Sequence, residues 1–314
     1  MLNVALVGVG GISAAHIPGW QALDNVRLVA LCDIRPQQME KYPDQRHYTD
    51  FDEMLQKEKI DILDICLPTY LHADFAEKAM RAGIHVLCEK PVSLHKEDVR
   101  RLYDIARENH VKFMVAQVIR FWPEYEIIKE LYDSGKYGKL LSGSMKRIGC
   151  RPKWSWDDWM FDRERSGLVP FDLHIHDLDF LVWAFGKPKN VTDFRSNRAN
   201  QDYINAVYEF DDFFITTEAA WFNAPYPFTV AFSFRFEKAL AAWENGEMKI
   251  YEADGKTYCP ISQGGEDTGD IGLPKSDAYA NEIRYFANCV EQDLAPEKVQ
   301  PTELEQVIEI LRAL

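Results

Sequence analysis

The segment 166–186, SGLVPFDLHIHDLDFLVWAFG, places an acid, a histidine and a second acid at helical spacing. If a helix begins near Pro170, then Asp172, His176 and Asp179 occupy positions i, i+4 and i+7 and share one face. A histidine titrates near neutrality, so it can accept or return a proton during a reaction. A neighbouring carboxylate can orient the ring or bind a hydroxyl group. The spacing therefore indicates proton transfer at a hydroxyl group.

A lysine stands at a second informative position. The apolar run HVLCEKP (85–91) reads as a buried strand that stops at Glu89, Lys90 and Pro91. A fixed cation there would stabilise an oxygen that is losing its proton. Lys90, Asp172 and His176 together supply the cation, carboxylate and base that oxidation of a secondary alcohol needs. Considered alone, His176 could equally be a histidine packed in the core, and Lys90 could equally be a residue of a surface turn.

Metal binding is the competing interpretation of the same segment. Asp172, His174, His176 and Asp177 are all potential ligands. On a strand, positions 172, 174 and 176 would share a face, as a zinc site requires. The following LDFLVWAFG continues as a helix, however, and a helix turns residues 174 and 176 about 200° apart. We therefore expect no metal.

The first 120 residues alternate between apolar strands and helical stretches. The expected strands are 2–10, 26–33, 60–68, 85–91 and 111–121, and helical stretches include 72–83 and 96–110. Continuous apolar strands separated by helices are typical of a parallel sheet covered on both faces. Such a doubly wound sheet, of the Rossmann type, binds ligands beyond the carboxyl ends of its strands. Lys90 stands at one of these ends.

The turn after the first strand predicts dinucleotide binding. Gly8 permits a tight turn, Gly10 allows a pyrophosphate to approach the backbone, and Ser13 replaces the third glycine of the pattern. Asp33, at the end of the second strand, would accept hydrogen bonds from ribose hydroxyl groups and favour NAD over NADP. Arg35 weakens that preference, so NADP stays an alternative. The cofactor contacts expected at the turn are Gly8, Gly10, Gly11 and Ile12.

The remainder of the chain has a different pattern. A helix is expected at 124–138, and strands of a mostly antiparallel sheet follow within 189–198, 205–222, 228–244 and 247–259. Two helices, 277–293 and 302–314, close the chain, and the turn-rich segment 262–277 is predicted to be a mobile loop. We expect a dinucleotide-binding domain at 1–121 and an α+β substrate and oligomerisation domain at 122–314. The C-terminal helices would pack back on the first domain.

Composition excludes several classes of protein. The net charge, 36 minus 50, is -14 and opposes binding of nucleic acid. No apolar stretch approaches the roughly 20 residues that span a bilayer. The six cysteines include no CxxC pair, so a zinc ribbon or redox dithiol is not expected. These features favour a cytoplasmic protein with reduced cysteines.

Three segments together resemble one known family across nearly the whole chain. They are VGVGGISAAHIPGW, ICLPTYLHADFAEKAMRAGIHVLCEKPVS and GLVPFDLHIHDLD, and DAYANEIRYFANCV resembles its C-terminal helix. The family is that of glucose–fructose oxidoreductase, inositol dehydrogenase and MocA-like proteins. Its pattern usually opens with two or three glycines and often has a glycine between the acid and the histidine. In this chain Gly167 is the one glycine at the start of the pattern, and His174 stands between Asp172 and His176 where the family often has glycine. His174 could therefore contact the substrate or pack in the core.

The resemblance implies roles for individual residues. Lys90 would be the active-site lysine, Asp172 the assisting carboxylate and His176 the acid or base. Pro68, Thr69, His72 and Glu89 would line the cofactor, and Arg120 would lie near the nicotinamide and the substrate. The family binds polyhydroxylated rings and commonly forms dimers or tetramers through its second sheet. Within RPKWSWDDWMF (151–161), Trp154, Trp156 and Trp159 would offer apolar faces to a sugar ring, although such aromatic clusters more often belong to a core or a subunit contact.

We therefore predict an NAD(P)-dependent oxidoreductase that transfers a hydride between nicotinamide and a ring carbon of a sugar, inositol or related polyol. One alternative is a redox-neutral epimerase or glycosidase in which NAD oxidises the sugar only transiently. Another is a regulatory protein that binds the nucleotide and catalyses nothing. The intact set of Lys90, Asp172 and His176 favours an enzyme. The substrate itself depends on the loops at 150–165 and 222–275.

Overall fold

The computed structural model describes residues 1–261 and 277–314, which divide into two compact units. Within this part, the first unit comprises residues 1–118 and 277–305, and the second comprises 119–261 and 306–314. Nearly all of the predicted loop at 262–277 lies outside the described residues. None of the described helices combines the length and the apolar content that a membrane crossing requires.

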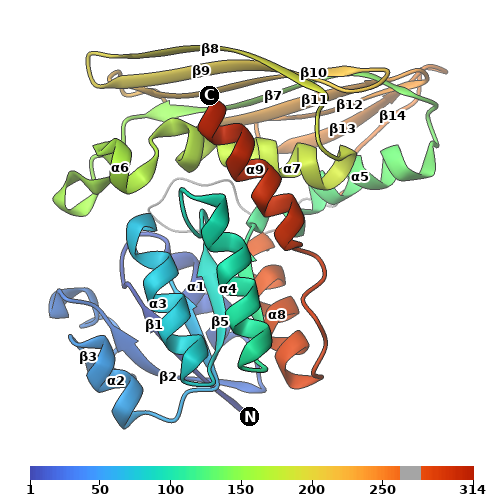
Figure 1. The fold of residues 1–314 in the computed structure, drawn as a ribbon. Coiled ribbons are helices and arrows are strands. Elements are labelled where there is room, and N and C mark those ends of the chain that lie inside the picture. Colours follow the sequence, from blue (N-terminus) through green and yellow to red (C-terminus); the bar gives the residue numbers. More distant parts are fainter. Residues whose placement is uncertain (262–276) are drawn as a thin grey trace. The chain divides into compact units, whose positions relative to one another are not determined.

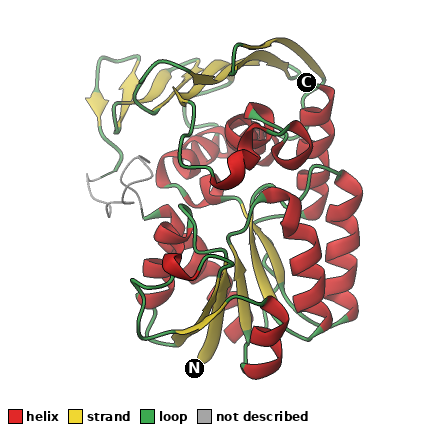
Figure 2. Cartoon of the chain, turned by 90° about the vertical axis from the view of Figure 1, so that its left-hand side faces the viewer, coloured by secondary structure: helices red, strands yellow, loops and turns green. Residues whose placement is uncertain are grey.

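The first unit is built on a six-stranded parallel sheet with the order β3-β2-β1-β4-β5-β6. Its strands are β1 (Leu2–Val7), β2 (Val26–Cys32), β3 (Arg46–Tyr48), β4 (Ile62–Ile65), β5 (His85–Glu89) and β6 (Phe113–Ala116). Its helices are α1 (Ser13–Gln21), η1 (Pro36–Gln38), α2 (Phe51–Lys57), α3 (Thr69–Arg81), α4 (Lys96–Glu108) and α8 (Ala278–Glu291). Helices lie on both faces of the sheet (Figure 2), which confirms the predicted doubly wound arrangement.

Burial explains why these segments form the sheet. Every residue of β4 and β6 is buried, as expected for strands covered on both faces. The covering helix α4 buries Val99, Leu102, Ile105 and Ala106, whose spacing of three and four forms one apolar stripe. Val7 pairs with both Cys32 and Ile65, so the carboxyl ends of the three central strands align.

Helix α8 joins the first unit although it lies near the end of the chain. It packs against α1, where Gly19 allows close approach. A Cβ atom at Gly19 would stand only 2.6 Å from Cδ1 of Ile283. The last helix, α9 (Pro301–Ala313), begins in the first unit and ends in the second.

The second unit contains an eight-stranded sheet with the order β14-β13-β12-β11-β7-β10-β9-β8. Its strands are β7 (Leu140–Cys150), β8 (Asn190–Arg198), β9 (Gln201–Glu209), β10 (Phe214–Phe222), β11 (Thr229–Phe236), β12 (Ala239–Glu244), β13 (Glu247–Glu252) and β14 (Thr257–Tyr258). Only the β7–β10 pair is parallel among these described strands, so the predicted mostly antiparallel sheet is confirmed.

Helices cover one face of this sheet (Figure 1). They are η2 (Val118–Phe121, which starts at the end of the first unit), α5 (Pro123–Ser134), η3 (Trp156–Phe161), α6 (Arg163–Ser166), the π-helical turn η4 (Pro170–His174) and α7 (Ile175–Phe185). The ring of Tyr125 on α5 lies 5.0 Å from that of Phe232, and Phe180 on α7 lies 5.8 Å from Phe234. Alternate residues of the strands point to this aromatic layer, and none of the described helices of the second unit covers the opposite face (Figure 1).

Candidate active site

The turn between β1 and α1 has the shape that a dinucleotide requires. Gly8 has a φ of +90°, and a Cβ atom there would lie 2.6 Å from the carbonyl oxygen of Cys66. Only glycine fits this position. A Cβ at Gly10 would meet no atom within 4 Å, so the backbone there is open to a ligand. Gly11 is exposed, Ile12 is half-buried, and α1 starts at the next residue.

Asp33 connects this turn to the loop after β2. Its Oδ2 accepts a hydrogen bond from the Val9 N–H at 2.8 Å, and its Oδ1 accepts one from the Arg35 N–H at 2.8 Å. The Arg35 guanidinium also lies beside Oδ1, with Nε at 3.3 Å. A carboxylate and a half-buried cation thus stand side by side where β2 ends. The glycine turn and this carboxylate fit the pyrophosphate and the ribose of a nicotinamide dinucleotide.

The residues after β4 form the next part of the carboxyl edge. Pro68 precedes α3, and Thr69 is its first residue. The ring of His72 is buried, with Nε2 2.6 Å from the Leu67 carbonyl oxygen and Nδ1 2.8 Å from that of Pro91. Burial lowers the pKa of His72, so a neutral ring donates to one carbonyl at a time. Its ring nitrogens thus face backbone carbonyls of the protein.

Lys90 directly follows β5 and is half-buried. Its backbone N–H donates to Oε2 of Glu89 at 2.9 Å, and its peptide bond to Pro91 is cis. Glu89 is only 6% exposed, and its Oε1 lies 3.0 Å from Nε2 of His16. His16 is a residue that the sequence analysis did not select. The signal for it was a single histidine on the helix that follows the glycine turn.

The polar residues of 172–179 in the second unit separate into two groups. Asp172 and His176 are half-buried, whereas His174, Asp177 and Asp179 are buried. A helical start near Pro170 is confirmed, because η4 begins there and continues into α7. The helical face predicted from the spacing therefore contains residues at different depths.

Each buried member of this segment contacts a residue of its own unit. His174 Nε2 lies 2.6 Å from the hydroxyl oxygen of Tyr208, and burial, helped by the charge of Arg147, lowers the pKa of His174 to about 3. Asp177 Oδ1 accepts from Nη2 of Arg147 at 2.8 Å. His174 is fully buried against Tyr208, so of its two open roles the structure favours packing.

Asp179 forms an ion pair with Arg120, a residue expected near the nicotinamide and the substrate. The guanidinium donates from Nε at 2.8 Å and from Nη2 at 2.7 Å to the two carboxylate oxygens. Both side chains are completely buried. Two N–H groups of Arg120 therefore donate to Asp179.

The metal interpretation finds no geometric support in this segment. Within residues 1–261 and 277–314, the one group of three potential ligands that lie close together is His16, Asp64 and Cys66 of the first unit. Asp172, His174, His176 and Asp177 are not part of it.

The tryptophans of 151–161 also separate by exposure. Trp154 is 63% exposed and Trp156 is 40% exposed, while Trp159 packs against a buried cluster that includes Met160. Trp154 and Trp156 therefore present ring surface outward, and Trp159 belongs to the core of the second unit.

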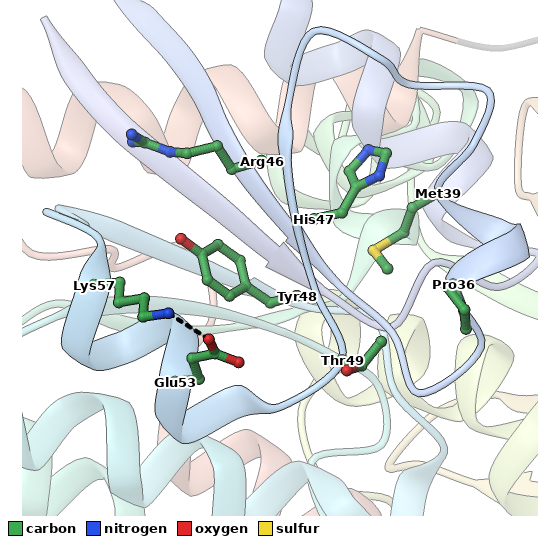
Figure 3. A pocket seen from close by; sticks show the side chains of 8 residues that line it. All are labelled: Pro36, Met39, Arg46, His47, Tyr48, Thr49, Glu53 and Lys57. Carbon is green, nitrogen blue, oxygen red and sulfur yellow. Dashed lines mark hydrogen bonds and ion pairs between the residues drawn. The ribbon is translucent and has the colours of Figure 1, made fainter.

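The first unit has a pocket of about 470 Å³ between η1, β3 and α2 (Figure 3). It is lined by Pro36, Met39, Arg46, His47, Tyr48, Thr49, Glu53 and Lys57. Lys57 pairs with Glu53 at 2.5 Å, and Arg46 pairs with Glu58. Its cations are already neutralised and none of the predicted site residues lines it, so we do not assign it to the active site.

Comparison with known proteins identifies both halves of the chain. Residues 2–117 match the model of the oxidoreductase family with an NAD-binding Rossmann fold, and residues 125–241 match the GFO/IDH/MocA C-terminal domain. The chain is 27% identical to inositol 2-dehydrogenase of Rhizobium meliloti (strain 1021) in an alignment that covers 94% of this chain and 91% of that protein.

Other relatives match over a shorter length. The 2,7-anhydro-N-acetylneuraminate hydratase of Mediterraneibacter gnavus is 30% identical over 202 residues, 64% of this chain and 54% of that protein. The chain spans about half the length of the first curated relatives that it matches, between 53% and 55%.

Solved structures confirm the fold. Levoglucosan dehydrogenase in complex with NADH and levoglucosan superposes with a TM-score of 0.83 at 19% identity, covering 99% of this chain and 95% of that one. Myo-inositol 2-dehydrogenase of Lactobacillus plantarum gives a TM-score of 0.82 at 22% identity, with the same coverage.

Proposed function

This chain belongs to the GFO/IDH/MocA oxidoreductase family, and on that premise we propose that it transfers a hydride between NAD and a ring carbon of a sugar, inositol or related polyol. One observation carries the proposal. Of the five acids and histidines between residues 172 and 179, only Asp172 and His176 keep part of their surface exposed. The other three are buried and contact Tyr208, Arg147 or Arg120. The pair that the chemistry needs is therefore the pair with exposed surface, which supports its assignment to the substrate.

Each residue has one role in the proposed reaction. NAD, which Gly8, Gly10 and Asp33 would hold, would supply the acceptor for the hydride of the carbon that carries the hydroxyl group. His176 takes the hydroxyl proton at a ring nitrogen, and the oxygen becomes that of a carbonyl group. The Lys90 ammonium stabilises negative charge on that oxygen while the proton leaves. Asp172 orients the imidazole or binds a neighbouring hydroxyl group. In the reverse direction His176 returns the proton.

A substrate panel tests this function. Purified protein is incubated with sugars, sugar acids and inositols in the presence of NAD or NADP, and nicotinamide absorbance is followed. We expect reduction of NAD by at least one ring polyol and loss of that activity in Lys90→Ala, with NADH binding retained. If no polyol reacts although NADH binds tightly, the chain is a nucleotide-binding regulatory protein instead.

A redox-neutral reaction is the second candidate. The observation that favours it is the similarity to 2,7-anhydro-N-acetylneuraminate hydratases of Mediterraneibacter gnavus and Escherichia coli, at 30% and 28% identity. In such a reaction His176 would first accept and later return a proton, and no reduced cofactor would accumulate. Product formation from an anhydro sugar without net NADH would favour this candidate.

We further propose that the enzyme assembles through its second sheet as a dimer or tetramer and works in the cytoplasm. The sheet face without described helices supports the assembly, and Phe194, Phe214 and Tyr251 are exposed on strands of this sheet. The six cysteines are all free, which fits a reducing compartment. Light scattering on the eluting peak of a gel-filtration column measures the assembly, and a monomer at all concentrations would contradict it.

A further inference from the structure

A histidine inside the first unit joins two neighbouring strands. His16 of α1 has Nδ1 at 2.9 Å from Oδ2 of Asp64, on β4, and Nε2 at 3.0 Å from Oε1 of Glu89, on β5. His16 and Asp64 are completely buried, and Glu89 is nearly so. One imidazole thus contacts a carboxylate from each strand.

These contacts determine the charge of the ring. An ionised carboxylate only accepts, so both ring nitrogens must donate, and only the imidazolium has two N–H groups. Each carboxylate also accepts from a second donor: the Trp20 Nε1–H donates to Asp64 at 2.6 Å, and the Lys90 N–H donates to Glu89 at 2.9 Å. Burial is the largest influence and opposes the charge, but Asp64 and Cys66 together raise the pKa of His16 well above its ordinary value. Against burial, the hydrogen bond and charge of His16 lower the pKa of Glu89.

The remaining neighbours bring no second cation to the ring. The Cys66 thiol lies 3.7 Å from Oδ1 of Asp64, and burial raises the pKa of that thiol. The ring of Tyr279, on α8, lies 5.7 Å from the imidazole. The imidazolium therefore contacts both carboxylates, the charge of Lys90 also lowers the pKa of Glu89, and neutral N–H donors complete the hydrogen bonding.

A metal ion is the alternative occupant of this cluster. His16, Asp64 and Cys66 present ligand atoms within 4.8 Å of one another. A ligating imidazole nitrogen must carry no proton, and a ligating cysteine must be a thiolate. Here both ring nitrogens point at carboxylate oxygens at hydrogen-bond length, and burial favours the thiol. Hydrogen bonds account for all these contacts without an ion.

We propose that His16 is a positioning residue for Lys90: its imidazolium holds one oxygen of Glu89, and the other oxygen holds the Lys90 backbone N–H. The inference rests on the proposed function, because it concerns the lysine assigned there to the substrate oxygen. The Glu89 carboxylate cannot rotate without breaking one of these two bonds. Asp64, held by Trp20, fixes the opposite side of the ring.

Loss of the His16 imidazolium would remove the contact that holds the Glu89 carboxylate in place. Glu89 would become a buried carboxylate without its cation, and such a group takes up a proton or draws in water. Either change weakens the bond to the Lys90 N–H. Because displacement of a catalytic group by about 1 Å costs roughly a hundredfold in rate, we expect His16→Gln to lower kcat by about ten- to a hundredfold. The affinity for NADH should stay unchanged.

The experiment compares His16→Gln, Glu89→Gln and the double variant with His110→Asn. His110 is an exposed histidine of the same unit with a φ of 54°, a conformation that asparagine tolerates. We expect a large fall of kcat in both single variants, no further fall in the double variant, and none in the control. Thermal unfolding and NADH fluorescence titration verify that each variant is folded and binds the cofactor.

Two measurements need no substrate, so they test the inference even if the proposed function fails. In nitrogen NMR spectra of the histidine rings, one imidazolium should persist at alkaline pH and disappear in His16→Gln. Amide exchange at Lys90 should be slow in the wild type and faster by about tenfold or more in His16→Gln. Both results together support the inference.

Several outcomes would overturn it. A neutral His16 at pH 7, or zinc bound in equimolar amount to the purified protein, would contradict the imidazolium bridge. A folded His16→Gln variant with unchanged kcat and unchanged exchange at Lys90 would reject the positioning role. A lower unfolding temperature with unaltered kcat would make His16 a purely structural residue.

Discussion

Arg120 and Asp179 face each other inside the second unit as a two-point ion pair, with Nε 2.8 Å from Oδ2 and Nη2 2.7 Å from Oδ1. Neither side chain is exposed. The pair links η2 to α7, the helix that contains His176. We expect this pair to affect the free energy of unfolding, because a buried charge that loses its partner destabilises the folded state.

Asp179→Asn should destabilise the protein substantially. The variant removes the charge of Asp179 that faces the buried Arg120 guanidinium, and breaking such a pair costs about 3–5 kcal/mol. Urea unfolding followed by tryptophan fluorescence measures the loss. The double variant Arg120→Met, Asp179→Leu should lose less than Asp179→Asn, because it removes both charges of this pair together.

The matched control is the exposed pair of Arg100 and Glu305, whose atoms lie 2.9 Å apart. Water screens this pair, so Arg100→Gln should unfold at the wild-type urea concentration. Equal behaviour of Asp179→Asn and Arg100→Gln would contradict the stabilising role of the buried pair.

The fold was predictable because its signals are local. Continuous apolar strands such as 113–116 are typical of a sheet covered on both faces, and Gly8 has the backbone conformation that the turn needs. Alternation in β9 and β11 likewise predicts a sheet with one buried face.

The site was only partly predictable because depth and distant contacts are not local. Helical spacing puts Asp172, His176 and Asp179 on one face, but it does not say that Asp179 is buried against Arg120, 59 residues away. His174 likewise depends on Tyr208, 34 residues away. A polar residue inside an apolar run, such as Asp64 in DILDIC, was the available signal for a buried network.

His176→Ala should abolish most turnover while the protein still binds NADH. Removal of a positioned general base typically costs about 10²- to 10⁴-fold in rate. Steady-state kinetics on the substrate found in the panel measures kcat, and NADH fluorescence measures binding. His110→Asn serves as the control, and normal activity of His176→Ala would rule out its role as the base.

Asp33→Asn should shift the cofactor preference toward NADP. The amide oxygen still accepts from the Val9 N–H, but the charge that repels a 2′-phosphate is gone. Since two charges about 4 Å apart interact by about 1 kcal/mol or more, the ratio of kcat/KM for NADP over NAD should rise at least roughly fivefold. Arg35→Gln should lower the same ratio, and a rise in both variants would contradict the argument.

Trp154→Ala should raise KM for the true substrate and leave kcat nearly unchanged. The ring is 63% exposed, so it has surface to offer to the C–H face of a sugar. Tyr251→Ala, which removes an exposed aromatic ring of β13, is the control. If both variants keep the wild-type KM, Trp154 has no part in substrate binding.

His174 should make the protein less stable in acid. Burial and the charge of Arg147 lower the pKa of His174 to about 3 in the folded state, whereas the unfolded chain has the ordinary value of about 6.5. Between these two values the unfolded state binds the extra proton, so the free energy of unfolding falls as the pH falls. The contribution of His174 should amount to about 2 kcal/mol between pH 7 and pH 5.

The variant His174→Gln isolates this contribution, because the amide can still pair with the Tyr208 hydroxyl but does not titrate. Urea unfolding at pH 7, 6 and 5 should show a steeper loss of stability for the wild type than for the variant. All other titrating groups are common to both proteins and cancel in the comparison. Parallel curves would mean that His174 is protonated, or reached by water, in the folded protein.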